Sequence, residues 1–125
     1  MVEIRREDIE GPVISAIGPS GYRVADRIVP GGLVLLPDNA LDWTPPALDA
    51  LDITALDTAL ALEPAPEFVL LGSGPRLEHP PAALRRALEE RNIGLEVMDS
   101  RAAARTWGLM RAEERWISAA LYPLG

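Results

Sequence analysis

Two short apolar runs, each followed by small polar residues and then by a helical pattern, constrain this fold most strongly. Residues 68–71 lead into the loop 72–74, and residues 95–98 lead into 99–100, with a predicted helix over 80–91 between them. A strand, a helix and a second strand in this order predict two parallel strands in one sheet. Their outgoing loops share one edge, where ligands of open α/β sheets tend to bind. The sequence therefore predicts where a site would lie, although no motif specifies a reaction.

The remaining segments predict a three-layer α/β domain with a mixed central sheet, flanking helices and an N-terminal β-hairpin or meander. Strands are expected at 13–17, 21–28, 33–36, 67–72, 95–98 and 115–122, and helices at 54–62, 80–91 and 100–111. The last strand is expected to run antiparallel to its neighbours, because the short turn before it leaves little room for a crossover. Residues 39–52 are ambiguous, and 47–51 could pair at a sheet edge.

Three residues are expected to cap helices, two at the start of a helix and one at its end. Thr54 and either Asp99 or Ser100 have side chains that suit the N-cap position. Asn92 suits a left-handed conformation at the end of the helix over 80–91.

The composition indicates one soluble globular domain over 1–125, with residues 1–12 as a loosely ordered lead-in. Hydrophobic residues make up 48% of the 125 positions, and no apolar run approaches the roughly 20 residues of a membrane span. The first eight residues mix both charges, which is untypical of a signal or transit peptide. The chain has no cysteine, so disulfides and thiolate sites are excluded. We expect a cytoplasmic protein.

The net charge of −7 is concentrated in the first half of the chain. From Asp38 to Glu67 there are seven acidic residues and no basic one. Binding to nucleic acid or to anionic membranes needs a basic face, so neither is expected as a partner. This acidic run is either a solvated surface or a docking face for another protein. The sequence permits a homo-oligomer but offers no patch that requires one.

The candidate catalytic motifs are incomplete. The loop Gly72-Ser73-Gly74 lacks the lysine of a phosphate-binding loop and the third glycine of a dinucleotide fingerprint. Ser73, His79 and Asp99 are the residue types of a hydrolytic triad, but the Gly-x-Ser-x-Gly turn is absent. One histidine and no cysteine leave only carboxylates for a metal, without calcium-loop spacing. We therefore expect no metal, no cofactor and no catalytic residue.

A small-molecule site at the sheet edge is the alternative interpretation. Backbone N–H groups of the loops Gly72-Ser73-Gly74 and Asp99-Ser100 could converge with Arg105 on a phosphate or carboxylate. The same residues could simply form a tight strand exit and a capped helix with a solvated arginine face. An ionised Asp99 would repel an anion unless it capped the helix or paired with Arg105.

Residues 98–107, 112–115 and 119–121 resemble a small family of unassigned function. That family includes bacterial and archaeal proteins, the adipogenesis-associated domain proteins of animals and a mitochondrial assembly factor of respiratory complex I. Earlier matches to its pattern are Tyr22, Pro30-Gly31, Pro37, Trp43 and Leu71-Gly72-Ser73-Gly74.

The chain departs from the family pattern at several positions of the C-terminal block. Arg101 and Glu114 replace glycines, Ala104 replaces a cysteine, Trp107 replaces a tyrosine and Gly108 an asparagine. The resemblance implies a three-layer α/β fold and, through the mitochondrial relative, an assembly role exerted by binding other proteins.

We therefore expect a non-enzymatic protein of the binding or assembly type, with an unidentified protein partner. Trp43 and the acidic run are the predicted partner surface. The alternative is a small-molecule binding protein or enzyme that uses the edge formed by residues 72–74 and 99–105.

Overall fold

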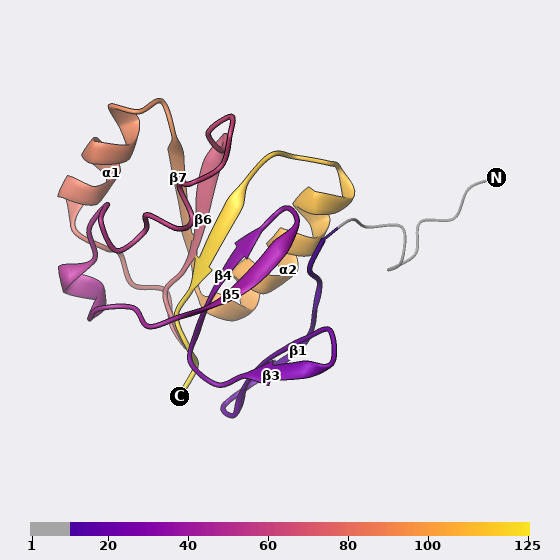
Figure 1. Cartoon of the computed structure of the whole chain (residues 1–125). Coiled ribbons are helices and arrows are strands. Elements are labelled where there is room, and N and C mark those ends of the chain that lie inside the picture. Colours follow the sequence, from indigo (N-terminus) through magenta and orange to yellow (C-terminus); the bar gives the residue numbers. More distant parts are fainter. Residues whose placement is uncertain (1–10) are drawn as a thin grey trace.

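The structure, a computed structural model, describes residues 11–125 and contains a five-stranded mixed sheet, a three-stranded antiparallel sheet and two α-helices (Figure 1). Most of the expected lead-in 1–12 lies outside the described residues. The elements are β1 (Ile14–Gly18), β2 (Gly21–Val24), β3 (Arg27–Val29), β4 (Gly32–Leu36), β5 (Asn39–Trp43), the 3₁₀ turn η2 (Leu48–Ala50), β6 (Phe68–Gly72), α1 (Ala82–Glu89), β7 (Gly94–Met98), α2 (Ser100–Ala112) and β8 (Ser118–Leu121).

The central sheet has the order β5-β4-β8-β6-β7, which confirms that the two apolar runs form adjacent parallel strands. Strand β8 is antiparallel to β4, as expected, but parallel to β6, so the expectation that it opposes all its neighbours was wrong. The reason is that α2 itself returns the chain along the sheet. Helix α2 therefore makes the crossover, and the short turn only has to connect the end of α2 to the start of β8.

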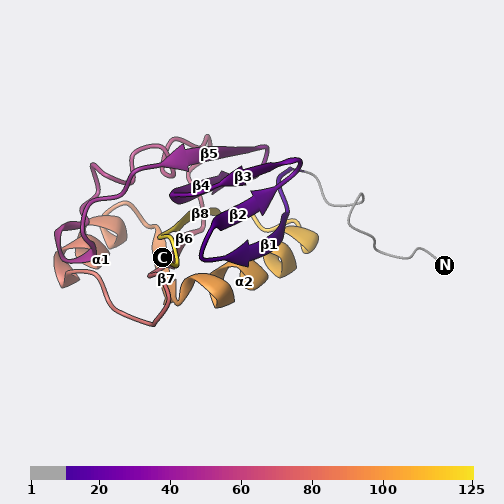
Figure 2. The ribbon, with the colours of Figure 1, turned by 90° about the horizontal axis from the view of Figure 1, so that it is seen from below.

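The sheet separates two apolar clusters, which makes the architecture three-layered. One face packs against α1 and the segment that contains Leu51, Leu56 and Ala59. The other face packs against α2 and the small sheet, with Trp107 and Tyr22 between them. Figure 2 shows α2 and the small sheet on the same side of the central strands. The mixed α/β class and the N-terminal antiparallel strands are thus as the sequence predicted.

The predicted helix over 54–62 is instead a series of tight turns. Its hydrogen bonds are mostly of the i to i−3 type, such as Leu56 N–H to Ile53 O at 3.2 Å. The cap is Asp52, whose Oδ1 accepts from Ala55 N–H at 3.0 Å, and not Thr54. Two prolines, Pro64 and Pro66, follow at once, so the segment is too short for a cooperative helix.

Two further strand boundaries differ from the prediction. Residues 21–28 form the hairpin of β2 and β3, because Ala25 adopts a φ of 54° that breaks an extended strand. The ambiguous stretch 39–52 begins with β5, which pairs with β4, while 48–50 form η2 instead of an edge strand.

The caps of the crossover helices agree with the sequence prediction. Asp99 is the N-cap of α2, and its Oδ1 accepts from Ala102 N–H at 2.9 Å. Asn92 has a φ of 60° after α1, the left-handed conformation expected of it. These local signals place the start of α2 directly at the exit of β7.

Candidate functional site

The predicted edge brings together the exits of β6, β7 and β8. Ser73 N–H donates to Met98 O and Ser100 N–H donates to Gly74 O, both at 2.8 Å. The Ser100 hydroxyl donates to Tyr122 O at 2.8 Å and accepts from Gly74 N–H at 2.9 Å. We call these four residues, Ser73, Gly74, Ser100 and Tyr122, the edge latch.

The polar groups of the edge latch are hydrogen-bonded to other groups of the protein. Ser73 Oγ accepts from Glu78 N–H at 3.1 Å, and two acceptors lie within reach of its proton, Arg76 O at 2.7 Å and Met98 O at 3.1 Å. Ser73 is 8% exposed and Ser100 is fully buried. The N–H groups of Ser73 and Gly74 that were expected to bind an anion therefore already have acceptors. The anion site predicted here stays a prediction, and a ligand would have to displace these bonds.

Gly72 allows the edge latch to close. A Cβ at this position would lie 2.7 Å from Leu121 Cδ2 and 2.8 Å from Ser100 Oγ. The absence of a side chain thus lets the start of α2 and strand β8 approach the end of β6 closely.

Arg105, the expected cationic partner of this edge, lies elsewhere. Together with Arg101 it lines a groove of about 210 Å³ between α2 and strand β1. Arg101 Nη1 donates to Ile17 O at 3.3 Å across that groove. Five of the six residues predicted for the ligand site therefore share one edge, while the arginine faces the small sheet.

The next features are the one histidine and the acidic side chains, which were considered above for a hydrolytic triad and for a metal site. His79 lines a separate pocket of about 190 Å³ with Arg85 and Leu95, beside α1. Among residues 11–125, no three His, Asp or Glu side chains gather in a way that could hold a metal ion. Within the same range, no helix is long and apolar enough to cross a membrane.

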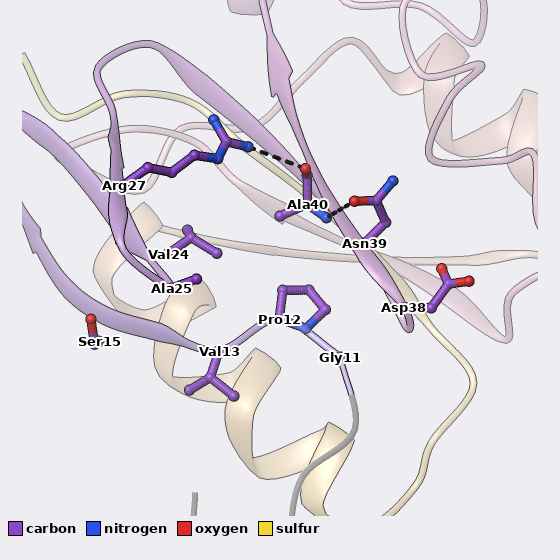
Figure 3. Close-up of a pocket in the computed structure, with 10 residues that line it drawn as sticks. All are labelled: Gly11, Pro12, Val13, Ser15, Val24, Ala25, Arg27, Asp38, Asn39 and Ala40. Atoms are coloured by element: carbon purple, nitrogen blue, oxygen red, sulfur yellow. Dashed lines mark hydrogen bonds between the residues drawn. The ribbon is translucent and has the colours of Figure 1, made fainter. Parts of the chain in front are cut away.

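A cavity of about 620 Å³ lies between the small sheet and the β4–β5 hairpin (Figure 3). Its lining includes Arg27, Asp38, Asn39 and Ala40. Arg27 donates to Asp42 Oδ1 at 2.7 Å and to Ala40 O at 3.3 Å, and Asn39 Oδ1 accepts from Ala40 N–H. Ser15 also lines the cavity, and its hydroxyl donates to Arg23 O at 3.4 Å.

A second large opening, of about 450 Å³, lies at Trp43 and is lined mainly by apolar side chains. We call it the Trp43 groove; its lining residues are Gly31, Gly32, Trp43, Thr44, Pro45, Pro46, Ala47, Leu48, Tyr122 and Pro123. Figure 1 shows the chain that leaves β5 passing the end of β8 at this point. The groove thus joins segments that are about 80 residues apart in the sequence.

The two aromatic rings of the Trp43 groove are held in fixed positions. Trp43 Nε1 donates to Ala55 O at 3.1 Å, and the Tyr122 hydroxyl donates to Pro46 O at 2.8 Å. Their ring centroids are 5.3 Å apart with an interplanar angle of 78°, an edge-to-face contact. Burial and, to a smaller extent, the charge of the Asp49 carboxylate together raise the pKa of Tyr122 to about 12.

The tyrosines provide a pH test of this arrangement. The chain has two tyrosines, no cysteine and no lysine, so only tyrosines titrate between pH 10 and 12. Burial raises the pKa of both Tyr22 and Tyr122. The native state therefore keeps protons that the unfolded chain releases, and the free energy of unfolding should fall as the pH rises from about 10 to about 12.

Ultraviolet absorbance of tyrosinate measures this titration directly. We expect the folded protein to titrate at higher pH than the urea-unfolded chain, and Tyr122→Phe to remove part of the loss of stability. Ionisation of both tyrosines near pH 10 in the folded state would contradict the burial described here.

Trp43 was the residue of the groove that the sequence analysis assigned to a partner surface. The available signal was the pairing of aromatic residues with prolines, in Trp43-Thr44-Pro45-Pro46 and Tyr122-Pro123. What the sequence did not show is that β4 and β8 are neighbours, which places these two segments together.

Comparison with known proteins relates the whole described fold to one family. The profile of the family described as "Protein of unknown function (DUF498/DUF598)" matches residues 14–122. The NADH dehydrogenase [ubiquinone] 1 alpha subcomplex assembly factor 3 of Danio rerio is 31% identical over 96% of this chain and 69% of its own length. The human protein of that name is 28% identical over 65% of its own length, so this chain spans about two thirds of these relatives. An uncharacterised protein of Rhodobacter capsulatus is 32% identical over 89% of this chain and 84% of its own.

Solved structures show the same fold. A protein from Bordetella parapertussis has a TM-score of 0.82 at 27% identity, covering 91% of this chain and 97% of its own. A protein from Xanthomonas campestris has a TM-score of 0.78 at 30% identity, covering 98% and 92%.

Proposed function

This chain belongs to the DUF498/DUF598 family, and from that premise we propose that it is a non-enzymatic protein of the binding or assembly type, acting on another protein in the cytoplasm. Relatives named as assembly factors of NADH dehydrogenase support an assembly role for members of the family.

The observation that carries the proposal is the Trp43 groove. Aromatic residues are enriched in the buried centres of protein interfaces, where they contribute large contact areas. Trp43 is half-buried and its indole N–H is already bonded to Ala55 O, so the exposed part of the ring is apolar and fixed. A rigid side chain loses little conformational entropy when it binds.

Affinity purification of the tagged protein from its own host, with quantitative mass spectrometry, tests the proposal. We expect wild-type protein to recover at least one protein reproducibly, and Trp43→Ala to lower that recovery about tenfold or more, as for an interface anchor. Trp116→Ala is the matched control, because Trp116 is also half-buried and its Nε1 also donates to a loop carbonyl, Pro64 O at 2.7 Å.

Circular dichroism must first show that both variants fold. Equal losses of the partner with both tryptophan variants would indicate general destabilisation and count against Trp43 as an anchor. If no protein were recovered reproducibly while a small molecule co-purified, the assembly role itself would be wrong.

A further inference from the structure

We propose that the Trp43 groove binds a basic, extended segment of a partner protein, with an arginine or lysine side chain close to Trp43 and Asp49. This inference rests on the proposed binding role and adds the chemistry of the partner. Three observations support it: the shape of the groove, the charge around it and its two aromatic rings.

The shape of the groove suits an extended peptide. Its volume of about 450 Å³ lies within the roughly 300–1,000 Å³ typical of ligand sites. Pro45, Pro46 and Pro123 line it together with the two aromatic rings. Proline and aromatic side chains form a surface with few rotatable bonds, and aromatic-lined grooves are a recurrent way to recognise extended segments.

The charge around the groove favours a cationic occupant. Within the run of seven acids, Asp42 pairs with Arg27 at 2.7 Å and Glu67 pairs with Arg115 at 3.1 Å. Asp49 is exposed, directly follows Leu48 of the lining, and acts on the hydroxyl of Tyr122 through its charge. None of the described residues that line the groove is basic.

The aromatic rings favour the same kind of occupant. The faces of Trp and Tyr attract ammonium and guanidinium groups, which makes a cation near Trp43 favourable independently of Asp49. An acidic segment would instead be repelled by Asp49 and would gain nothing from the rings. The groove therefore discriminates by charge as well as by shape.

Gly31 is a position in the lining of the groove where a larger residue can be introduced as a test. A Cβ at Gly31 would meet only Trp43 O, at 3.7 Å, which is an ordinary contact distance. Gly31 is not among the glycines with positive φ, so a larger residue fits its backbone conformation. A Cβ added there would extend the lining of the groove without displacing its neighbours.

Fluorescence anisotropy with the full chain and labelled ten-residue peptides tests the proposal. The basic probe alternates arginine with proline and leucine, and its counterpart has glutamate at each arginine position. We expect the basic peptide to bind at least about tenfold more tightly than the acidic one, and to weaken as salt screens the charges.

Three variants separate local from general effects. Gly31→Leu, which fills the groove, and Asp49→Lys, which reverses its charge, should each weaken the basic peptide about tenfold or more. Glu89→Lys on α1 changes the net charge by the same amount outside the lining and should have little effect. Asp49 and Glu89 are both exposed, so neither change is expected to unfold the chain.

Three results would overturn the inference: no charge-selective binding, equal weakening by Asp49→Lys and Glu89→Lys, or binding of free arginine amide as tight as that of the peptide. The last result would indicate a site for a small cation. The proposed function is tested separately, because a natural partner that Gly31→Leu still recovers would support an assembly role at another surface.

Discussion

Replacing Trp107 with alanine is expected to lower the free energy of unfolding by about 3–5 kcal/mol. Trp107 is 1% exposed and lies in the cluster between α2, the central sheet and the small sheet. Its Nε1 also donates to Pro12 O at 3.0 Å, so one side chain connects α2 to the segment that leads into β1. Truncation would leave a large cavity where three elements meet.

Urea unfolding followed by far-ultraviolet circular dichroism measures this effect without relying on tryptophan fluorescence. Leu109→Ala is the control on the same helix, because Leu109 is 65% exposed and its truncation should change stability by no more than about 0.5 kcal/mol. A loss below about 1 kcal/mol for Trp107→Ala would show that the small sheet does not depend on this side chain.

Gly72→Ala is expected to destabilise the protein by about 1–3 kcal/mol, although it adds only one methyl group. The new Cβ would lie 2.7 Å from Leu121 Cδ2, 2.8 Å from Ser100 Oγ and 3.0 Å from Ser100 Cα. The last of these is a backbone atom, so α2 itself would have to shift. That shift would strain the bonds of Ser100 to Gly74 and Tyr122.

Gly108→Ala is the matched control and should have the opposite sign. Gly108 lies within α2, and a Cβ there would meet nothing within 4 Å. Alanine should therefore stabilise the helix by about 0.5–1 kcal/mol through its higher propensity. Chemical unfolding of both variants tests the pair, and a neutral Gly72→Ala would contradict the close approach that forms the edge latch.

The edge latch explains why the predicted ligand-binding edge offers few free donors. The N-terminus of a helix leaves backbone N–H groups without partners inside the helix, and an anion can satisfy them. Here the Asp99 side chain accepts from Ala102 N–H, while Gly74 O accepts from Ser100 N–H. Residues of the two strand exits therefore accept hydrogen bonds from two of the N–H groups at the start of α2, and the anion site stays a prediction.

Local patterns in the sequence determined much of this protein. The apolar runs at β6 and β7, the caps Asp99 and Asn92, and the parallel pairing of the two strands all follow from nearest-neighbour chemistry and chain connectivity. The gathering of residues 72–74 with Asp99 and Ser100 followed from the same topology, since adjacent parallel strands end at one edge.

Other features depended on contacts that no local pattern records. The direction of Arg105 was decided by the packing of β1 against α2, since the arginine lines the groove between them. The helical pattern at 54–62 gave way to turns that place Leu56 and Ala59 in the core, where burial outweighs a weak local preference.

The Trp43 groove is the clearest case of a feature that only the tertiary structure decided. Trp43 and Tyr122 meet because β4 pairs with both β5 and β8, which brings the ends of those two strands together. The sequence identified Trp43 and the acidic run as a candidate surface from composition alone. The second ring, the proline walls and the opening at Gly31 come from strand pairing between distant segments, and that pairing is set by burial of the whole sheet rather than by any short stretch of residues.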